Sequence, residues 1–424
     1  MSLALANPSS TARRKIARRL LPFLFLIYMT AFIDRVNVGF AGLEMTRELH
    51  FSNEVFGFGA GIFFFGMCLL EIPGAMAAHS RSARTWIASI MIFWGVLASC
   101  TGLIQTATEF NIIRFLLGAA EGGFFPSVMV YMTHWFRQTD RAKAVALFMT
   151  AIPASSAIGG IIAGGLLGVH WLGVSGWRWL LILEGIPAAI FGFVTFFYLT
   201  DRPGDALWLS DDEKAWIGAE LARERAAQET GLPEVSILRR FLSLTVLSLV
   251  AGYFFINLTA YGLNIWLPKM VQKLPGLTLW QVGLVASLPH LCAIPAMIVV
   301  GWNADRTGLH KRHATIAALI AAAGLAISQL PGISATLVVI GFCIAMMGIM
   351  SYCPCFWALP TKLLNARLAA AACGLISMAN LGGFVGPYAI GFFTDLTGTQ
   401  LAGVLVLMIS AILAGTVLQL LPTQ

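Results

Sequence analysis

The loop Gly301-Trp-Asn-Ala-Asp305-Arg306-Thr-Gly308 follows a long apolar segment, and a weaker copy of it stands in the first half of the chain. The copy begins 226 residues earlier, at Ala75, and also follows an apolar segment. A similar offset relates Gly159-Gly160 to Gly382-Gly383. Matching features at a nearly constant offset indicate that two similar halves follow each other in the chain.

Each half contains six apolar segments of about 20 residues, the length that crosses a bilayer as a helix. Hydrophobic residues make up 58% of the 424 residues and charged residues only 11%, whereas soluble proteins have about 25% charged residues. We therefore expect an all-α integral membrane protein with twelve transmembrane helices in two six-helix bundles. The segments lie near 20–40, 54–77, 84–104, 109–132, 143–167, 178–199, 241–266, 280–302, 313–331, 335–358, 367–392 and 400–421.

One long polar stretch separates the two sets of six segments. We expect residues 1–199 to form the N-terminal bundle, 200–240 a cytoplasmic, partly helical linker, and 241–424 the C-terminal bundle.

Basic residues precede the first apolar segment, as in a signal peptide. That segment continues to about Phe40 without a small-residue cleavage site, so we interpret it as a retained first helix.

The distribution of Lys and Arg predicts the orientation in the membrane. Of the 27 basic residues, 21 fall in the N-terminus and the even-numbered loops, 4 fall in the opposite loops, and Arg35 and Arg114 lie within spans. Positive charge favours the cytoplasmic side, so both termini should be cytoplasmic in a multi-pass protein of the cell (inner) membrane. The net charge of +7 is explained in this way, and we expect no nucleic-acid partner.

The sequence lacks the motifs of several other chemistries. The seven cysteines lie in apolar segments, and Cys353 and Cys355 do not have the spacing of a redox or zinc pair. We expect no metal site and no cofactor. Without a phosphate-binding loop or a hydrolase motif, the protein should be neither ATP-driven nor an enzyme, which leaves ion gradients as the energy source.

Four ionisable residues lie inside predicted spans: Asp34 and Arg35 in the first, and Arg114 and Glu121 in the fourth. Charges in hydrocarbon are costly and usually functional. Seven helical residues make nearly two turns, so Arg114 and Glu121 share a face. Arginine can bind a carboxylate through two hydrogen bonds, and a buried carboxyl can carry a proton. The alternative is that Asp34 with Arg114, or Arg35 with Glu121, form structural ion pairs.

Several strings together with the 301–308 loop resemble the major facilitator superfamily and, within it, the anion:cation symporter family. They are Phe32-Ile-Asp34-Arg35-Val-Asn37, Arg114-Phe-Leu-Leu-Gly118-Ala-Ala-Glu121, Phe356-Trp357 and Asn380-Leu-Gly382-Gly383. The bacterial tartrate, phthalate and sugar-acid permeases are the most similar members. The resemblance implies a major facilitator fold, with Asp34 and Glu121 as proton-coupling residues and Arg35 as the residue that binds the substrate carboxylate.

Further candidate residues complete the predicted site. We expect Arg114 and, from the second half, Tyr261, Trp357 and Asn380 to bind substrate, although packing is an equal alternative for the two aromatic residues. Asp305 and Arg306 are predicted to gate the pathway, with Arg367 as a partner of Asp305. Glu71 and Glu184 also lie in apolar segments, but packing is favoured for both, so they are left outside the site.

The sequence departs from the family pattern at a few positions. His79 and Ser82 stand where the second copy of the loop has Asp305 and Gly308, which puts the acidic gating contact on that side in doubt. Phe32 and Met67 replace tyrosines of several members, which suggests fewer hydrogen bonds to the substrate and an anion that is less polar than a sugar acid or differently shaped.

The sequence therefore predicts a proton-coupled importer of a small organic anion, such as tartrate, another hydroxy or sugar acid, or an aromatic carboxylate. Its partners would be the anion, H⁺ and the lipid bilayer, and alternating access would take place within a monomer. An organic-anion exchanger or facilitator without proton coupling is the alternative.

Overall fold

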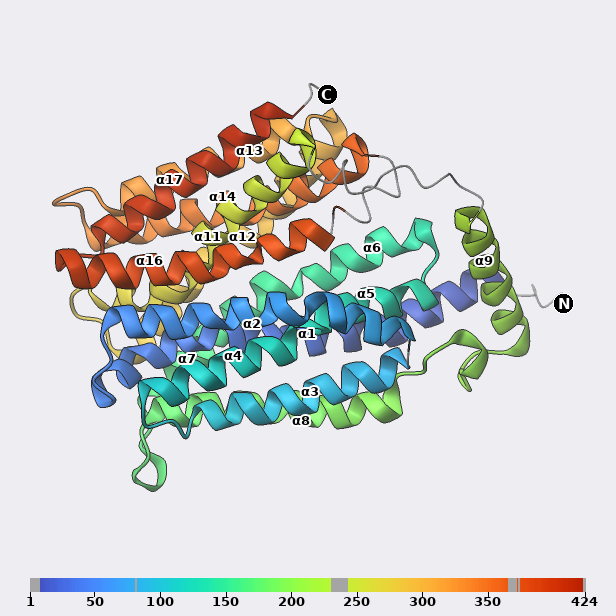
Figure 1. Ribbon diagram of the computed structural model, residues 1–424, viewed down its shortest axis with the longest axis horizontal. Coiled ribbons are helices and arrows are strands. Elements are labelled where there is room, and N and C mark those ends of the chain that lie inside the picture. The colour runs from blue at the N-terminus through green and yellow to red at the C-terminus, as the bar shows by residue number, and fades with distance from the viewer. Residues whose placement is uncertain (1–7, 81, 230–242, 365–371, 373, 422–424) are drawn as a thin grey trace, which may run out of the picture.

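A computed structural model describes residues 8–80, 82–229, 243–364, 372 and 374–421, and the regular elements in these ranges are helices. Long helices run side by side in both halves of the chain (Figure 1). The elements are α1 (Pro8–Glu48), α2 (Asn53–Ser80), α3 (Ala83–Thr101), α4 (Ala107–Gly122), α5 (Phe124–Trp135), α6 (Gln138–Met149), α7 (Ala151–Leu167), η1 (Trp171–Gly173), α8 (Gly176–Tyr198), η2 (Pro203–Asp205), α9 (Asp211–Glu229), α11 (Leu244–Gln272), α12 (Leu279–Thr307), α13 (His310–Ser328), α14 (Ala335–Leu363), η3 (Met378–Leu381), α16 (Gly382–Thr397), α17 (Leu401–Val417) and η4 (Leu418–Leu420).

The described helices correspond to the twelve predicted segments. Within the described ranges, eleven spans are long and apolar enough to cross a membrane. The twelfth segment is α13, whose first turn is His310-Lys311-Arg312-His313, so the basic turn lowers the hydropathy of a helix only 19 residues long. The first part of the predicted segment 367–392 lies outside the described residues.

Two of the spans are interrupted near their middle. The fourth is divided into α4 and α5 at Gly123, and the fifth into α6 and α7 at Thr150. A proline follows each interruption closely: Pro126 is four residues after Gly122, and Pro153 is four residues after Met149. Proline lacks the N–H that the preceding turn needs, and its ring collides with the carbonyl four residues back. These prolines account for the breaks.

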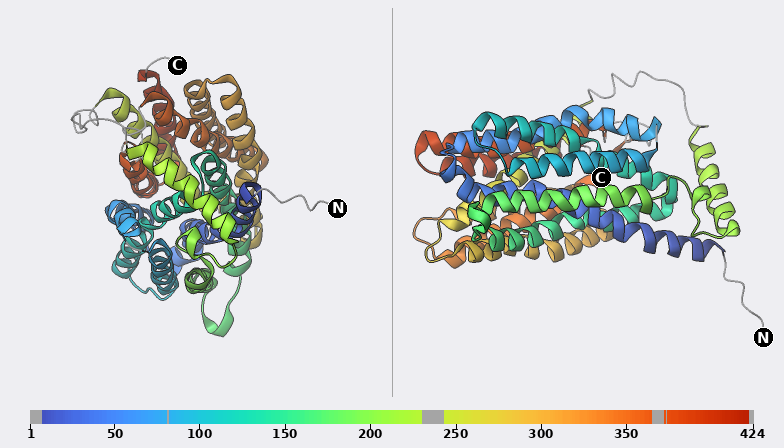
Figure 2. Two further views of the ribbon diagram at one scale, coloured as in Figure 1. Left: turned by 90° about the vertical axis from the view of Figure 1, so that its right-hand side faces the viewer. Right: turned by 90° about the horizontal axis from the view of Figure 1, so that it is seen from below.

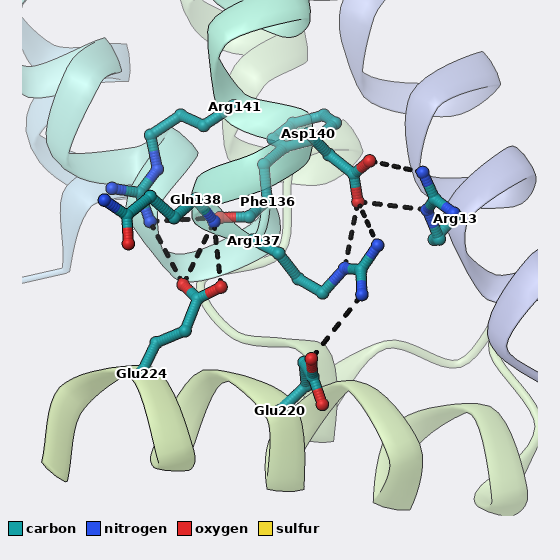
Figure 3. A network of polar contacts seen from close by, with 8 residues as sticks. All are labelled: Arg13, Phe136, Arg137, Gln138, Asp140, Arg141, Glu220 and Glu224. Carbon is teal, nitrogen blue, oxygen red and sulfur yellow. Dashed lines mark hydrogen bonds and ion pairs between the residues drawn. The ribbon is translucent and has the colours of Figure 1, made fainter. Parts of the chain in front are cut away.

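The polar linker contains one helix, α9, which lies across one end of the bundle (Figure 2). Figure 3 shows how charged residues attach it to the first half. Asp140 forms ion pairs with Arg13 and, at 3.0 Å, with Arg137, and Arg137 reaches Glu220 of α9 at 3.5 Å. The carboxylate of Glu224 accepts the backbone N–H of Gln138 at 2.9 Å. The linker is therefore partly helical, as expected, and α9 is docked on the first half.

The two halves approach each other closely between the last part of α7 and the first turns of α12, toward the end of the bundle opposite α9. A Cβ atom on Gly283 would lie 2.5 Å from the carbonyl oxygen of Gly160, so only glycine fits there. The Ser287 hydroxyl donates to the carbonyl of Ala157 at 2.9 Å. The paired glycines bring two backbones into contact across the interface between the halves.

At the end opposite α9, the carboxylate of Asp395 on α16 caps the first turn of α2. It accepts the backbone N–H of Glu54 at 2.7 Å and that of Asn53 at 3.3 Å, and the Asn53 side-chain amide at 2.8 Å. The Tyr388 hydroxyl donates to Glu54 at 3.1 Å. Helices α2 and α16 lie beside each other at this end (Figure 1). An acid at a helix N-terminus stabilises it, so this cap holds the two halves together.

We predict that Asp395→Ala loosens this end of the protein. Loss of a helix cap costs about 1 kcal/mol, which is roughly a fivefold change in the balance between closed and open arrangements. Spin labels at Arg47 and Thr399, in a variant without native cysteines, would report the distance between the halves. We expect longer distances between the labels in Asp395→Ala. The control Asp211→Ala, which changes an exposed side chain of α9, should leave the distances unchanged. An unchanged distribution would show that the cap does not hold the halves together.

Candidate functional site

Arg35 of α1 and Glu121 of α4 form a buried ion pair between the two helices. The Nε and Nη2 atoms of Arg35 lie 2.7 Å and 2.5 Å from the same oxygen, Oε1 of Glu121. The side chains are 8% and 0% exposed, and Oε2 of Glu121 is buried without a hydrogen-bond partner. One of the two edges of the guanidinium that can bind a carboxylate with two donors is therefore occupied by an internal carboxylate.

Aromatic side chains surround this ion pair. The Arg35 guanidinium lies 4.6 Å from the ring centre of Phe32 and 5.8 Å from that of Phe63. Tyr261 of α11 contacts Arg35 through its hydroxyl and packs on Phe64, with 4.2 Å between ring centres. Rings provide cation–π contact with the guanidinium. Tyr261 thus brings the second half of the chain to the charge that lies in the first.

Asp34 and Arg114 lie beside the ion pair without forming one of their own. Arg114 is 2% exposed, its guanidinium lies 4.7 Å from the Phe63 ring centre, and its Nε has no hydrogen-bond partner. Asp34 is 4% exposed with Oδ2 unpartnered. Their charges act on each other electrostatically. Of the two ion pairs considered from the sequence, the structure contains the Arg35–Glu121 pair.

The structure also places near this cluster three residues that the sequence analysis left out. Tyr28 is buried, and its hydroxyl interacts electrostatically with Arg35. It precedes Arg35 by seven residues on α1, a spacing that puts both on one helix face and could have revealed it. Glu71 interacts with Arg35, and Glu184 with Asp34. Packing was favoured for both acids, yet both lie within reach of the charged cluster.

The other predicted substrate residues of the second half occupy different surroundings. Trp357 packs edge-on against Tyr253, with 5.1 Å between ring centres. Asn380 is half-buried in η3, the short element before α16. The structure therefore brings Tyr261 to Arg35, while Trp357 and Asn380 remain predicted substrate residues whose role rests on the sequence.

The predicted gating residues lie at the end of α12, near the α9 end of the bundle. Oδ1 of Asp305 lies 2.9 Å from Nε2 of His310, and Nδ1 of His310 lies 2.8 Å from Nζ of Lys362. Arg306 lies over the ring of Trp302. These contacts join α12, α13 and α14 within the second half. Arg367, the expected partner of Asp305, is outside the described residues.

In the first half, an acid from elsewhere in the chain contacts the corresponding loop. Asp201, after α8, accepts the Ser82 hydroxyl at 2.6 Å and the backbone N–H of Arg84 at 3.0 Å. The sequence left an acidic contact on this side in doubt because His79 and Ser82 replace the acid and glycine of the second copy. Asp201 gives this loop an acidic contact within the first half, and a gating role for an acid on this side stays in doubt.

Comparisons with known proteins agree on the family. Residues 24–387 match the model of the Major Facilitator Superfamily. A protein of Agrobacterium vitis that carries the name tartrate transporter is 42% identical over 92% of this chain and 90% of its own length. A protein of Pseudomonas putida named as a metabolite transport protein is 39% identical over 91% of this chain and 89% of its own.

Solved structures with low sequence identity share the fold. A bacterial homologue of the human lysosomal transporter Spinster matches with a TM-score of 0.76 at 17% identity, over 96% of this chain and 98% of that one. The Escherichia coli xylose transporter matches with a TM-score of 0.72 at 16% identity, over 94% and 95%. The expected all-α fold is thus confirmed, and the chain is a transporter rather than an enzyme. It belongs to the major facilitator superfamily.

Proposed function

We propose that this transporter carries a small organic anion together with protons. The observation that carries the proposal is the occupied edge of Arg35, whose Nε and Nη2 both contact Oε1 of Glu121. A substrate carboxylate that binds this edge of Arg35 competes with Glu121 for the same two donors. Protonation of Glu121 weakens its hold on Arg35 and frees the guanidinium for the substrate. Proton binding and anion binding are thereby linked at one arginine.

The cycle follows from this competition. Protons bind to Glu121 and Asp34, the carboxylate of the substrate replaces Glu121 at Arg35, and Arg114 adds positive potential. Tyr261 then connects the bound anion to the second half, so that binding can favour movement of the two halves. After the site opens to the other side, loss of the protons restores the Arg35–Glu121 pair and expels the anion.

The lining of the site favours an organic anion that is partly apolar. Phe32, Phe63 and Phe64 lie around Arg35 and Tyr261, and such rings suit an aromatic acid or a small hydroxy acid better than a large, fully hydroxylated one. Two similar proteins bear the name tartrate transporter. We place tartrate, other hydroxy acids and aromatic carboxylates in the substrate class.

The distribution of positive charge indicates the orientation in the membrane, and the pH gradient then gives the direction of transport. The described basic residues Arg13, Lys15, Arg137 and Arg141 cluster at the α9 end, which we assign to the cytoplasm. The Asp395 cap then lies on the outer side. With acid outside, protons move inward and bring the anion with them.

We predict that Asp34→Asn abolishes accumulation but retains exchange. An amide cannot carry a proton, so the variant cannot use the pH gradient. It can still exchange one anion for another across the membrane. Proteoliposomes with acid outside and a panel of labelled carboxylates would measure both processes, with Asp211→Asn as control. Wild-type uptake that ignores the gradient or requires an internal counter-anion would reject symport and favour exchange.

We predict that Glu121→Gln reduces the pH dependence of substrate affinity. In the wild type, affinity should fall as pH rises, because ionised Glu121 competes for Arg35; glutamine is neutral at every pH. Arg35→Ala should weaken binding by about 3 kcal/mol, roughly a hundredfold, because two charge-assisted hydrogen bonds are lost. Calorimetry with the carboxylate identified by the panel measures all three proteins. A pH dependence in Glu121→Gln that is as steep as in the wild type would exclude this competition.

A further inference from the structure

Glu184 of α8 is a buried acid to which the transport cycle above gives no role. It is 9% exposed and contacts Asn37 of α1, whose side-chain Nδ2 meets Oε2 of the carboxyl group. Two oxygen atoms of this contact remain without a partner: Oε1 of Glu184 and Oδ1 of Asn37, both buried. The contact therefore lacks a hydrogen-bond donor rather than an acceptor.

A proton on Glu184 would supply that donor. An ionised carboxylate only accepts hydrogen bonds, whereas a carboxylic acid also donates one. A carboxylic acid and a carboxamide can satisfy each other with two reciprocal hydrogen bonds, one from the amide N–H and one from the acid O–H. Unpartnered buried polar atoms cost roughly 1–3 kcal/mol each, so the protonated form fits these surroundings better.

The neighbouring helices do not provide a positive charge that would favour the ionised form. On α1, the charge that acts on Glu184 is the acidic Asp34, three residues before Asn37 on the same helix face. On α7, Gly159 lies against Oδ1 of Asn37, and on α3, Gly95 and Ser99 lie against Gly185. Arg178, which lies near the start of α8 and six residues before Glu184, is engaged by Glu48 at 3.0 Å. A buried carboxylate without a cation is strongly disfavoured.

From this arrangement we propose that Glu184 is a further proton-binding residue of the transporter, positioned by Asn37 and acting with Asp34. The inference rests on the proposed proton-coupled function. Glu184 holds its proton while paired with Asn37. It takes this proton from the outer water and releases it to the inner water when the site opens inward and the pair with Asn37 separates. Because two neighbouring carboxylates repel each other when both are ionised, the protons on Glu184 and Asp34 are coupled and cross together with the substrate.

The test uses Glu184→Gln, which keeps the size of the side chain and can form the same reciprocal pair with Asn37, but binds no proton. Infrared spectra of the purified proteins report the carbonyl stretch of protonated carboxylic acids. We expect Glu184→Gln to lose one such band, and Asn37→Ala to shift that band because the hydrogen bond is lost. The matched control Glu109→Gln, an exposed acid at the start of α4, should change neither. A spectrum with the band intact in Glu184→Gln would overturn the proposal.

Transport then tests whether the proton moves with the substrate. The substrate gradient that just balances a fixed pH gradient in proteoliposomes gives the number of protons per anion. We expect one proton fewer in Glu184→Gln, which lowers the accumulation ratio by about tenfold for each pH unit of gradient. An unchanged accumulation ratio would overturn the proposal for Glu184 and leave the proposed proton-coupled function standing. If the wild type itself ignored the gradient, the proposed function would fail, and the infrared band would still decide whether Glu184 binds a proton.

Discussion

The buried ion pair between Arg35 and Glu121 is the interaction on which the rest of the site depends. Removal of one partner from such a pair typically costs about 3–5 kcal/mol, because the other charge is left in a medium of low polarity. The pair joins α1 to α4, and the same guanidinium contacts Phe63 of α2 and Tyr261 of α11. A change in its charge therefore acts on several helices and on both halves at once.

Most of the fold could be predicted from hydropathy alone, because a helix in hydrocarbon must satisfy its own backbone hydrogen bonds. Hydropathy could not predict where helices break or extend. The interruptions near Gly123 and Thr150 arise from Pro126 and Pro153, residues that an average over a whole segment conceals. Helix α1 begins at Pro8, far before the apolar segment, since its first turns carry basic side chains that contact Asp140 and α9.

The candidate site could be predicted in part, since charges within membrane spans are rare. That rarity identified Asp34, Arg35, Arg114 and Glu121, but helical spacing gives only the face of a residue and not its partner. Helical spacing could not predict the pairing of Arg35 with Glu121 or the contact with Tyr261, because both depend on how separate helices pack together. Glu184 was missed because a nearby proline favoured a packing role, although an acid in an apolar segment gives the same signal as Asp34.

The balance of charge around Arg35 explains why this site suits a proton-coupled anion carrier. In the described residues, four carboxyl groups and two guanidinium groups form one electrostatic cluster. Asp34, Glu71 and Glu121 interact with Arg35 or Arg114, and Glu184 interacts with Asp34. Neutrality in low dielectric requires about two of the acids to be protonated before substrate enters. Each negative charge on an incoming anion then requires one further proton. Under this constraint, the proposed movement of an anion through the site would be accompanied by protons.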